Sequence, residues 1–344
     1  MLNVVCAGLG RIGAQHAFNI AHRTPNAKLL AVFDPDESKQ KWAQDNLPKD
    51  VVFTTSYTEL LAIKGAQLVW IATPTPFHAE QMIAAMDCDL NVFCEKPISL
   101  DIDKAQAVVD HWRTQKPHLY VTIGFIRRFD SRYQLAAEQL KKGAIGRPLV
   151  LQTQSCDPRD HTGHFVNQYA PVSGGIFVDC AIHDIDLTLW LFGDHAQRVK
   201  KVFATGSSTV LPKLKEYGDC DNVIGVVEFE SGALAQYYCS RTSSSGQLLS
   251  TQLIGDKGRL TLRPEAPTAQ LSLSDSVSIA REASEERPNY YDLNGTAMLS
   301  EPETIVREIL NGSKPAFGLE DSVRGLRIGL ALQQSLREGR HIEL

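Results

Sequence analysis

The first 125 residues alternate short apolar runs with stretches whose apolar residues recur at helical spacing. Strands that alternate with helices are typical of a parallel sheet, because parallel neighbours need a crossover connection, usually a helix. We therefore expect a doubly wound α/β domain. Its strands are predicted at residues 2–7, 29–33, 51–53, 68–72, 91–94 and 120–124, and its helices include residues 12–22, 77–86 and 101–112.

A different pattern begins near Phe125. Helical and strand patterns are followed, beyond Gln197, by alternating strands that are separated by glycine-containing turns. Such turns join antiparallel neighbours, so we expect an α+β domain with an open, largely antiparallel sheet. The predicted elements are helices at 134–142, 296–310 and 321–337, a strand at 149–155, and turns at 230–232 and 255–258.

Length and composition narrow the class of protein. A chain of 344 residues fits two domains, which we place at residues 1–125 and 126–344. A net charge of −5 without a basic run disfavours a nucleic-acid partner. No apolar run approaches the roughly 20 residues that span a bilayer, and seven scattered cysteines lack a Cys-x-x-Cys spacing. We expect a cytoplasmic protein with no membrane partner, no disulfide framework and no structural zinc.

The segment Gly8-Leu9-Gly10-Arg11-Ile12-Gly13 matches Gly-x-Gly-x-x-Gly between a predicted strand and a predicted helix. In this context Gly8 permits a tight turn, Gly10 lets the backbone approach a pyrophosphate, and Gly13 permits close helix–strand packing. Arg11 and Ile12 then lie in the first helical turn, whose free N–H groups attract phosphate. These five residues are predicted to bind a dinucleotide.

Asp34 ends the second predicted strand, 21 residues after Gly13. A carboxylate there accepts hydrogen bonds from a ribose 2′-hydroxyl and repels a 2′-phosphate, which favours NAD over NADP. Lys39 and Lys41 follow closely and leave NADP open. The alternative for Asp34 is a helix-capping role.

Two further loops leave carboxyl ends of predicted strands, where open α/β sheets bind ligands. The first carries Thr73, Pro74, Thr75 and His78, and we expect it to skirt the nicotinamide ribose, although an ordinary strand-to-helix connection is the alternative. The second is Glu95-Lys96-Pro97. A desolvated ammonium is costly, so Lys96 is a candidate for proton exchange; the alternative is a solvated edge lysine.

Gly174-Gly175 opens a predicted helix that alternates apolar and ionisable residues. At about 100° per residue, Asp179 and His183 would lie within ~40° of each other on one helix, and Asp186 would share their stripe. A charged stripe beside so much apolar sequence points to a functional pair. A structural His–Asp pair near a helix start is the alternative.

Together, the glycine motif, Glu95-Lys96-Pro97 and Gly174-Gly175-x3-Asp179-x3-His183 resemble the glucose–fructose oxidoreductase, inositol dehydrogenase and MocA family over essentially the whole chain. The resemblance implies a Rossmann domain, a sheet-containing second domain and NAD(P)-dependent oxidation of sugar or cyclitol hydroxyls. It implies that Lys96 contacts the reacting hydroxyl, Asp179 is its carboxylate partner and His183 is the general base. Glu95 and Lys96 are also expected among the cofactor-binding residues.

Within the family, the chain is most similar to the inositol 2-dehydrogenase subgroup, which implies substrate contacts from Arg127 and Asp157 besides His183. Asn167 precedes the Gly174 helix, in the loop where polar substrate contacts are expected. It departs from that subgroup after Arg241, where tyrosines around a glycine are replaced by residues 242–247. The remaining acidic and histidine residues nearby, Asp160, His161 and His164, fit no standard metal spacing, and no metal is expected.

We therefore expect an NAD-dependent dehydrogenase that oxidises a secondary hydroxyl of a cyclitol, sugar or sugar acid to a ketone or lactone. Two alternatives stay open: an NADP-dependent dihydrodiol- or xylose-type dehydrogenase, and a non-catalytic dinucleotide-binding sensor or repressor. An exposed apolar sheet face is a dimerisation surface, and family resemblance supports a homodimer or homotetramer.

Overall fold

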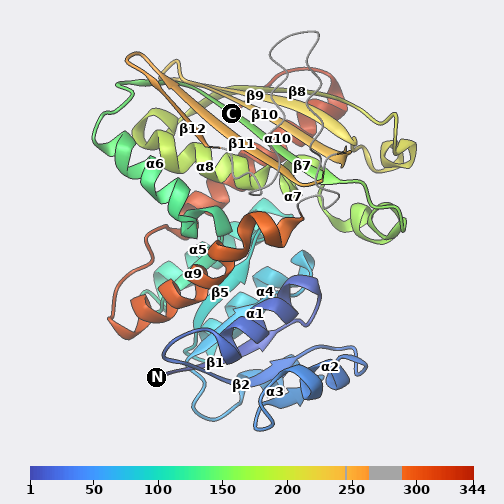
Figure 1. Cartoon of the computed structure of the whole chain (residues 1–344), viewed down its shortest axis with the longest axis vertical. Coiled ribbons are helices and arrows are strands. Elements are labelled where there is room, and N and C mark those ends of the chain that lie inside the picture. Colours follow the sequence, from blue (N-terminus) through green and yellow to red (C-terminus); the bar gives the residue numbers. More distant parts are fainter. Residues whose placement is uncertain (245, 263–288) are drawn as a thin grey trace, which may run out of the picture. The chain divides into compact units, whose positions relative to one another are not determined.

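The computed structural model describes residues 1–244, 246–262 and 289–344, which form two compact units (Figure 1). The first unit comprises residues 1–130 and 296–327, and the second comprises residues 131–295 and 328–344. The sequence-based division assigned all of 126–344 to the second domain. In the structure, residues 296–327 group instead with the N-terminal part of the chain.

A six-stranded parallel sheet forms the centre of the first unit, in the order β3-β2-β1-β4-β5-β6. The predicted parallel sheet is confirmed. The strand order reverses direction between β1 and β4, which is the switch point where open α/β sheets bind dinucleotides. The strands are β1 (Leu2–Ala7), β2 (Ala27–Phe33), β3 (Val52–Thr54), β4 (Leu68–Ile71), β5 (Asn91–Glu95) and β6 (Val121–Gly124).

Buried side chains explain why these strands are central. Every residue of β4 and of β6 is buried, as expected for strands covered on both faces. Trp70 of β4 stacks on Phe93 of β5 with ring centroids 3.7 Å apart. Ile305 and Val306 belong to the same hydrophobic cluster, so the C-terminal segment completes the core of the first unit.

The second unit contains a seven-stranded mixed sheet in the order β12-β11-β7-β10-β9-β8-β13. Among the described strands of this sheet, only β7 and β10 pair in parallel. The other neighbours are antiparallel, which confirms the expected, largely antiparallel sheet. The predicted turns join β9 to β10 and β11 to β12. The strands are β7 (Pro148–Pro158), β8 (Val199–Ser207), β9 (Asn222–Phe229), β10 (Leu234–Ser243), β11 (Leu248–Gly255), β12 (Arg259–Leu262) and β13 (Ile342–Glu343).

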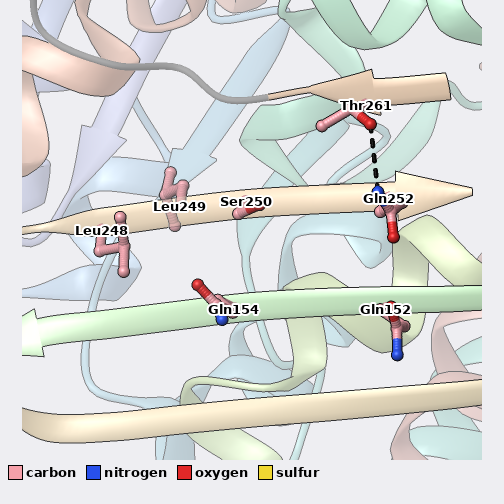
Figure 2. A pocket seen from close by; sticks show the side chains of 7 residues that line it. All are labelled: Gln152, Gln154, Leu248, Leu249, Ser250, Gln252 and Thr261. Atoms are coloured by element: carbon pink, nitrogen blue, oxygen red, sulfur yellow. Dashed lines mark hydrogen bonds between the residues drawn. The ribbon is translucent and has the colours of Figure 1, made fainter. Parts of the chain in front are cut away.

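In the described part of the chain, one face of this sheet is buried and the other, the open face, carries exposed side chains. Alternation along β9 places Val223 and Val227 in the core while Ile224 and Val226 point outward. Helical side chains cover the inner face, since a Cβ added at Gly225 would meet the ring of Phe177 at 2.6 Å. The open face carries a hollow between β7 and β11 (Figure 2). Its lining residues are Gln152, Gln154, Leu248, Leu249, Ser250, Gln252 and Thr261.

The helices fall close to the predicted positions. In the described part of the chain, none is long and apolar enough to cross a membrane. The α-helices are α1 (Arg11–His22), α2 (Lys39–Asn46), α3 (Tyr57–Leu61), α4 (His78–Asp87), α5 (Ile102–Gln115), α6 (Ser131–Lys141), α7 (Ile176–Asp179), α8 (Ile182–Phe192), α9 (Tyr290–Leu310) and α10 (Leu319–Glu338). Short helical segments are η1 (Thr75–Phe77), η2 (Ile126–Phe129), η3 (Phe165–Tyr169), η4 (Ala170–Val172), η5 (Gly193–Ala196) and η6 (Pro212–Tyr217).

The prediction that one continuous helix carries both Asp179 and His183 is wrong, because the helix is interrupted between them. Helix α7 ends at Asp179, and α8 begins at Ile182. The Ala181 N–H donates to the Ile176 carbonyl oxygen, five residues back, at 3.0 Å. This wide turn breaks the i to i−4 pattern, so the ~40° relation that one continuous helix would give does not apply.

Candidate active site

The glycine turn of the first unit has the shape that a dinucleotide requires. Gly8 has a φ of +95°, and a Cβ there would lie 2.6 Å from the Ala72 carbonyl oxygen. At Gly13 a Cβ would lie 2.1 Å from the Gly8 carbonyl oxygen, so a side chain is excluded at both positions. At Gly10, by contrast, an added Cβ meets nothing within 4 Å. Gly10 therefore borders open space at the start of α1.

The N-terminus of α1 suits an anion. Gly10 is the N-cap residue and offers no side-chain hydrogen bond to the helix, and no acidic residue lies in the first turn. The first helical residues are Arg11, which is exposed, and Ile12, which is half-buried. A helix start without a side-chain cap leaves backbone N–H groups for phosphate oxygens.

Asp34 is built into the same turn. Its Oδ2 accepts a hydrogen bond from the Leu9 N–H at 2.7 Å, and its Oδ1 accepts one from the Asp36 N–H at 3.0 Å. The N-cap residue of the next helix is Ser38, so Asp34 does not cap it in the ordinary way. The bond from Leu9 instead fixes the carboxylate beside the glycine loop, where a ribose is expected.

The loop after β4 is fixed by hydrogen bonds to the buried side chain of His78. Thr73, Pro74 and Thr75 lead into η1, and the Thr73 hydroxyl donates to the Gln81 side-chain oxygen at 2.5 Å. His78 is buried, and its two ring nitrogens lie 2.8 Å from the Thr73 carbonyl oxygen and 2.7 Å from that of Pro97. Burial lowers the pKa of His78. The ring thus links the two loops that follow β4 and β5.

Glu95 and Lys96 stand at the end of β5, both half-buried. Glu95 Oε2 accepts the backbone N–H of Lys96 at 3.3 Å, and its Oε1 lies 2.8 Å from His16 Nε2. His16 comes from α1, where it is 1% exposed and packs against Trp70 and Phe93. Glu95, the residue before Lys96, is therefore held to helix α1 through His16.

A buried carboxyl group, that of Glu301, lies near His16. Glu301 of α9 is 1% exposed, and its Oε2 is 4.0 Å from His16 Nδ1. Within the described residues, neither carboxyl oxygen of Glu301 has a hydrogen-bond partner. Burial, with the nearby Glu95 carboxylate, raises the pKa of Glu301 well above its usual value. The raised pKa favours the protonated form of Glu301 in the folded protein.

This protonation predicts a pH-dependent effect of Glu301→Gln on stability. Above the ordinary pKa of 4.5 the carboxyl ionises more readily in the unfolded chain than in the folded protein, so wild-type stability falls as pH rises. Glutamine cannot ionise. We expect the free energy of unfolding of Glu301→Gln to rise relative to that of the wild type as pH increases above 4.5.

Thermal unfolding of both proteins at several pH values measures this difference. The gain should vanish as pH falls toward 4.5, the ordinary carboxyl value. Glu80→Gln, at a side chain that is 74% exposed, is the matched control and should show no such trend. A pH-independent difference between Glu301→Gln and wild type would mean that Glu301 is ionised in the fold.

In the second unit, Asp179 ends α7 as a buried, ion-paired carboxylate. Arg241 Nη2 donates to Asp179 Oδ2 at 2.6 Å, and the Tyr169 hydroxyl donates to Asp179 Oδ1 at 2.8 Å. Burial disfavours the charge of Arg241, but attraction to Asp179 and other neighbours raises its pKa above the usual value. Sequence reasoning assigned no role to Arg241 or Tyr169, because neither is near Asp179 in sequence.

His183 is the accessible residue of this region. From Gly175 to Leu189 every residue except His183 is buried, whereas His183 is half-buried. It lies in the first turn of α8, and Ile182 and Ile185 beside it belong to the core. Asp184 and Asp186 point into the protein and are also buried. The imidazole is therefore the ionisable group of this segment with the greatest access to solvent.

Two predicted substrate residues, Asp157 and Asn167, lie in the second unit and have polar partners. Asp157, at the end of β7, accepts hydrogen bonds from Gln247 Nε2 at 2.7 Å and from Arg241 Nη1 at 3.5 Å. Asn167 lies in η3, is exposed, and accepts a bond from Lys213 Nζ at 2.8 Å. Asp157 and Asp179 are thus joined by one guanidinium, while Asn167 is two residues from Tyr169 in the same segment.

Arg127 has a different setting. It lies in η2 of the first unit and is 6% exposed. Its neighbour Arg128 stacks over the ring of Phe317 at 4.1 Å, which ties η2 to the C-terminal segment of the same unit. Little of the Arg127 side chain is therefore accessible.

Asp160, one of the residues considered as metal ligands, has other partners. Asp160 accepts hydrogen bonds from the Thr162 hydroxyl at 2.6 Å and from the Phe165 N–H at 2.7 Å, and these bonds lower its pKa to about 2. In the described part of the chain, no three His, Cys, Asp or Glu residues are arranged to hold a metal ion. The hollow in Figure 2 contains none of the predicted site residues.

Comparison with known families agrees with this geometry. Residues 2–123 match the family model described as an oxidoreductase family with an NAD-binding Rossmann fold. Residues 133–261 match the GFO/IDH/MocA C-terminal domain. The two matches together cover most of the chain, one in each compact unit.

Individual relatives span the whole chain. The scyllo-inositol 2-dehydrogenase (NAD(+)) of Bacillus subtilis is 30% identical over 99% of this chain and 96% of its own length. The myo-inositol 2-dehydrogenase of Thermotoga maritima is 30% identical over 98% of this chain and 97% of its own length.

A solved structure shows the same fold with ligands. The scyllo-inositol dehydrogenase of Lactobacillus casei, with bound NAD(H) and scyllo-inositol, has a TM-score of 0.89 and 29% identity, covering 100% of this chain and 99% of that one. The glycine turn and Asp34 of the first unit fit the dinucleotide that such a domain binds. The chain therefore belongs to the GFO/IDH/MocA oxidoreductase family and is an oxidoreductase whose N-terminal domain is an NAD-binding Rossmann domain.

Proposed function

We propose that this protein is an NAD-dependent dehydrogenase that oxidises a secondary hydroxyl of a cyclitol, sugar or sugar acid to a ketone or lactone. The observation that carries the proposal is the accessible imidazole of His183, set on a buried segment directly after the ion-paired Asp179. The full-length similarity to inositol 2-dehydrogenases supports a cyclitol as the first substrate to test.

The catalytic roles follow from the chemistry of the side chains. When bound, NAD supplies the hydride acceptor at nicotinamide C4, and the Gly8 turn and Asp34 hold the cofactor. His183 takes the proton of the reacting hydroxyl, because an imidazole has a pKa near working pH. Lys96 donates to the same oxygen and stabilises its developing negative charge. Asp179, which Arg241 holds in place, is the carboxylate that we assign to support this proton transfer.

Substrate contacts are proposed for residues with hydrogen-bonding groups suited to hydroxyls. Asp157 is 37% exposed while fixed by two donors, and Asn167 is held by Lys213, so both present oriented polar atoms. Arg127 is proposed as a further contact, although only a small part of it is accessible. A carboxylate and an amide together bind several hydroxyls of a polyol, with specificity set by their fixed positions.

Initial rates of NADH formation test the function. The panel contains myo-inositol, scyllo-inositol, aldoses and sugar acids, each with NAD and with NADP. Turnover of one polyol or sugar supports the proposal. Tight NADH binding without turnover of any compound would overturn it in favour of a dinucleotide-binding sensor, and turnover only with NADP would overturn the cofactor preference.

Asp34 is expected to set that preference. In Asp34→Asn, the side-chain oxygen can still accept the Leu9 N–H, but the charge that repels a 2′-phosphate is lost. We expect the NAD-to-NADP ratio of kcat/KM to fall about 10–100-fold, the value of a charged hydrogen bond. Asp36→Asn, next to it and exposed, is the control. An unchanged ratio in Asp34→Asn would contradict this role.

We also propose a cytoplasmic homodimer or homotetramer. The seven cysteines are free thiols, which suits a reducing compartment. On the open face of the second sheet, Phe203, Ile224 and Val226 are 44%, 44% and 37% exposed, and a partner subunit would cover such an apolar face. Light scattering of the purified protein gives the number of subunits, and a monomer would overturn this assembly.

A further inference from the structure

We infer that Arg241 is a positioning residue for the proposed reaction, because its guanidinium joins the Asp179 carboxylate to Asp157 and to the segment that carries Asn167. The inference rests on the proposed function in assigning catalysis to Asp179. The tether itself is a property of the second unit and is tested separately below.

The guanidinium uses two nitrogens on two carboxylates. Nη2 lies 2.6 Å from Asp179 Oδ2, and Nη1 lies 3.5 Å from Asp157 Oδ2. Gln247 Nε2 holds the other oxygen of Asp157 at 2.7 Å. Arginine can make such a two-pronged contact because its donors form a rigid planar fork, whereas lysine offers a single charge centre.

Strand pairing places these groups together. Strands β7 and β10 are parallel neighbours, with Cys156 opposite Ser240, so Asp157 and Arg241 lie near the carboxyl ends of adjacent strands. The register of β10 shifts between Ser240 and Ser243, where Arg241 lies. The Arg241 N–H also donates to the Asp221 carbonyl oxygen at 2.8 Å, which fixes its backbone. The guanidinium therefore projects from a sheet rather than from a loop.

Because the Arg241–Asp179 ion pair is buried, each side chain needs the other to compensate its charge. The side chains of Arg241 and Asp179 are 7% and 10% exposed. Removing one member of a buried pair leaves the other charge without compensation, and the remaining group then shifts or admits water. The position of Asp179 therefore depends on its ion pair with Arg241 more strongly than the position of an exposed carboxylate would depend on such a pair.

The same ion pair holds η3 at two points. The Arg241 guanidinium lies over the Phe165 ring at 4.5 Å, and the Tyr169 hydroxyl donates to Asp179 at 2.8 Å. Phe165 and Tyr169 are the first and last residues of η3, and Asn167 lies between them. Asp160, by accepting the Phe165 N–H, closes the turn before η3. Arg241 thus connects the proposed catalytic carboxylate to a proposed substrate contact.

The variants Arg241→Met and Arg241→Lys test the role of the fork. We expect Arg241→Met to lose about 10²-fold in kcat/KM, the cost of misplacing a catalytic group by roughly 1 Å. Arg241→Lys keeps a charge beside Asp179 but loses the second prong. It should recover much of kcat while KM for the polyol stays raised, a split that general destabilisation would not produce. Affinity for NADH should be unchanged in both.

Tyr169→Phe removes the second tether of Asp179 at a residue that is 41% exposed, and it should lower kcat with little loss of stability. Arg198→Met, at a side chain 79% exposed, is the matched arginine control and should behave as wild type. Wild-type kcat and KM in both Arg241→Met and Arg241→Lys, in a protein that oxidises a polyol, would overturn the inference.

Hydrogen exchange measured by mass spectrometry separates this outcome from failure of the proposed function. In the Arg241 variants, amides of residues 160–180 should exchange faster, and those of the first unit should not change. Unchanged exchange at 160–180 would overturn the inference whatever the substrate. Faster exchange in a protein whose wild type oxidises no polyol or sugar would sustain the tether and overturn the proposed function.

Discussion

Replacement of His183 by alanine is expected to lower kcat for polyol oxidation by about 10²–10⁴-fold, the usual contribution of a general base. The hydroxyl proton would then have to pass to water, a much weaker base than imidazole. His183 lies in the second unit, away in sequence from the glycine turn and Asp34, so NADH affinity should stay at the wild-type value. Initial rates at saturating NAD and NADH titration by fluorescence measure the two quantities.

The pH profile distinguishes a base from a substrate contact. Wild-type kcat/KM should decline at acidic pH as the imidazole becomes protonated, and this decline should be absent in His183→Ala. His118→Ala, at a histidine whose side chain is 63% exposed, is the matched control. If His183→Ala kept the wild-type kcat and only its KM were raised, His183 would bind the substrate without acting as the base.

Replacement of Lys96 by methionine is expected to lower kcat by about 10²–10³-fold, as does the loss of one donor to a developing oxyanion. Methionine keeps most of the side-chain length but has neither charge nor donor. The backbone contacts around Lys96, including its N–H to Glu95, do not require the ammonium and should persist. Cofactor binding should therefore survive, with the loss confined to the chemical step.

Lys104→Met is the control for Lys96→Met, since Lys104 is 54% exposed and pairs only with the surface residue Glu80 in the described contacts. Lys96→Arg should recover little, because the guanidinium fork cannot place one donor as the ammonium does. A Lys96→Met protein that turns over at the wild-type rate once NAD is saturating would show that Lys96 serves cofactor binding alone.

Local pattern was sufficient for the two sheets. Apolar runs marked β1 to β6 to within about two residues, because strands buried on both faces read as continuous apolar sequence. Helix α2 had no such signal, since Ala43 is its one buried residue. The place of residues 296–327 in the first unit was also not predictable, because it depends on core contacts of Ile305 and Val306 with distant strands.

The sequence predicted which residues belong to the candidate site, but it did not predict how their side chains are arranged or which partners hold them. Helical periodicity did not predict the break between α7 and α8. Nor did it predict the partner of Asp179, because Arg241 lies 62 positions along the chain. Glu301 faces His16 from almost the opposite end of the sequence. A motif shows which residue types recur together, whereas such tertiary partners appear only once the chain is folded.

Direct transfer of hydrogen from the substrate carbon tests the central claim most directly. The protein is incubated with NAD and with myo- or scyllo-inositol deuterated at the ring carbons, and the NADH formed is examined by NMR. The proposed reaction predicts one deuterium at nicotinamide C4 and an inosose product in equal amount. NADH without deuterium, or no NADH from any compound of the panel, would contradict it.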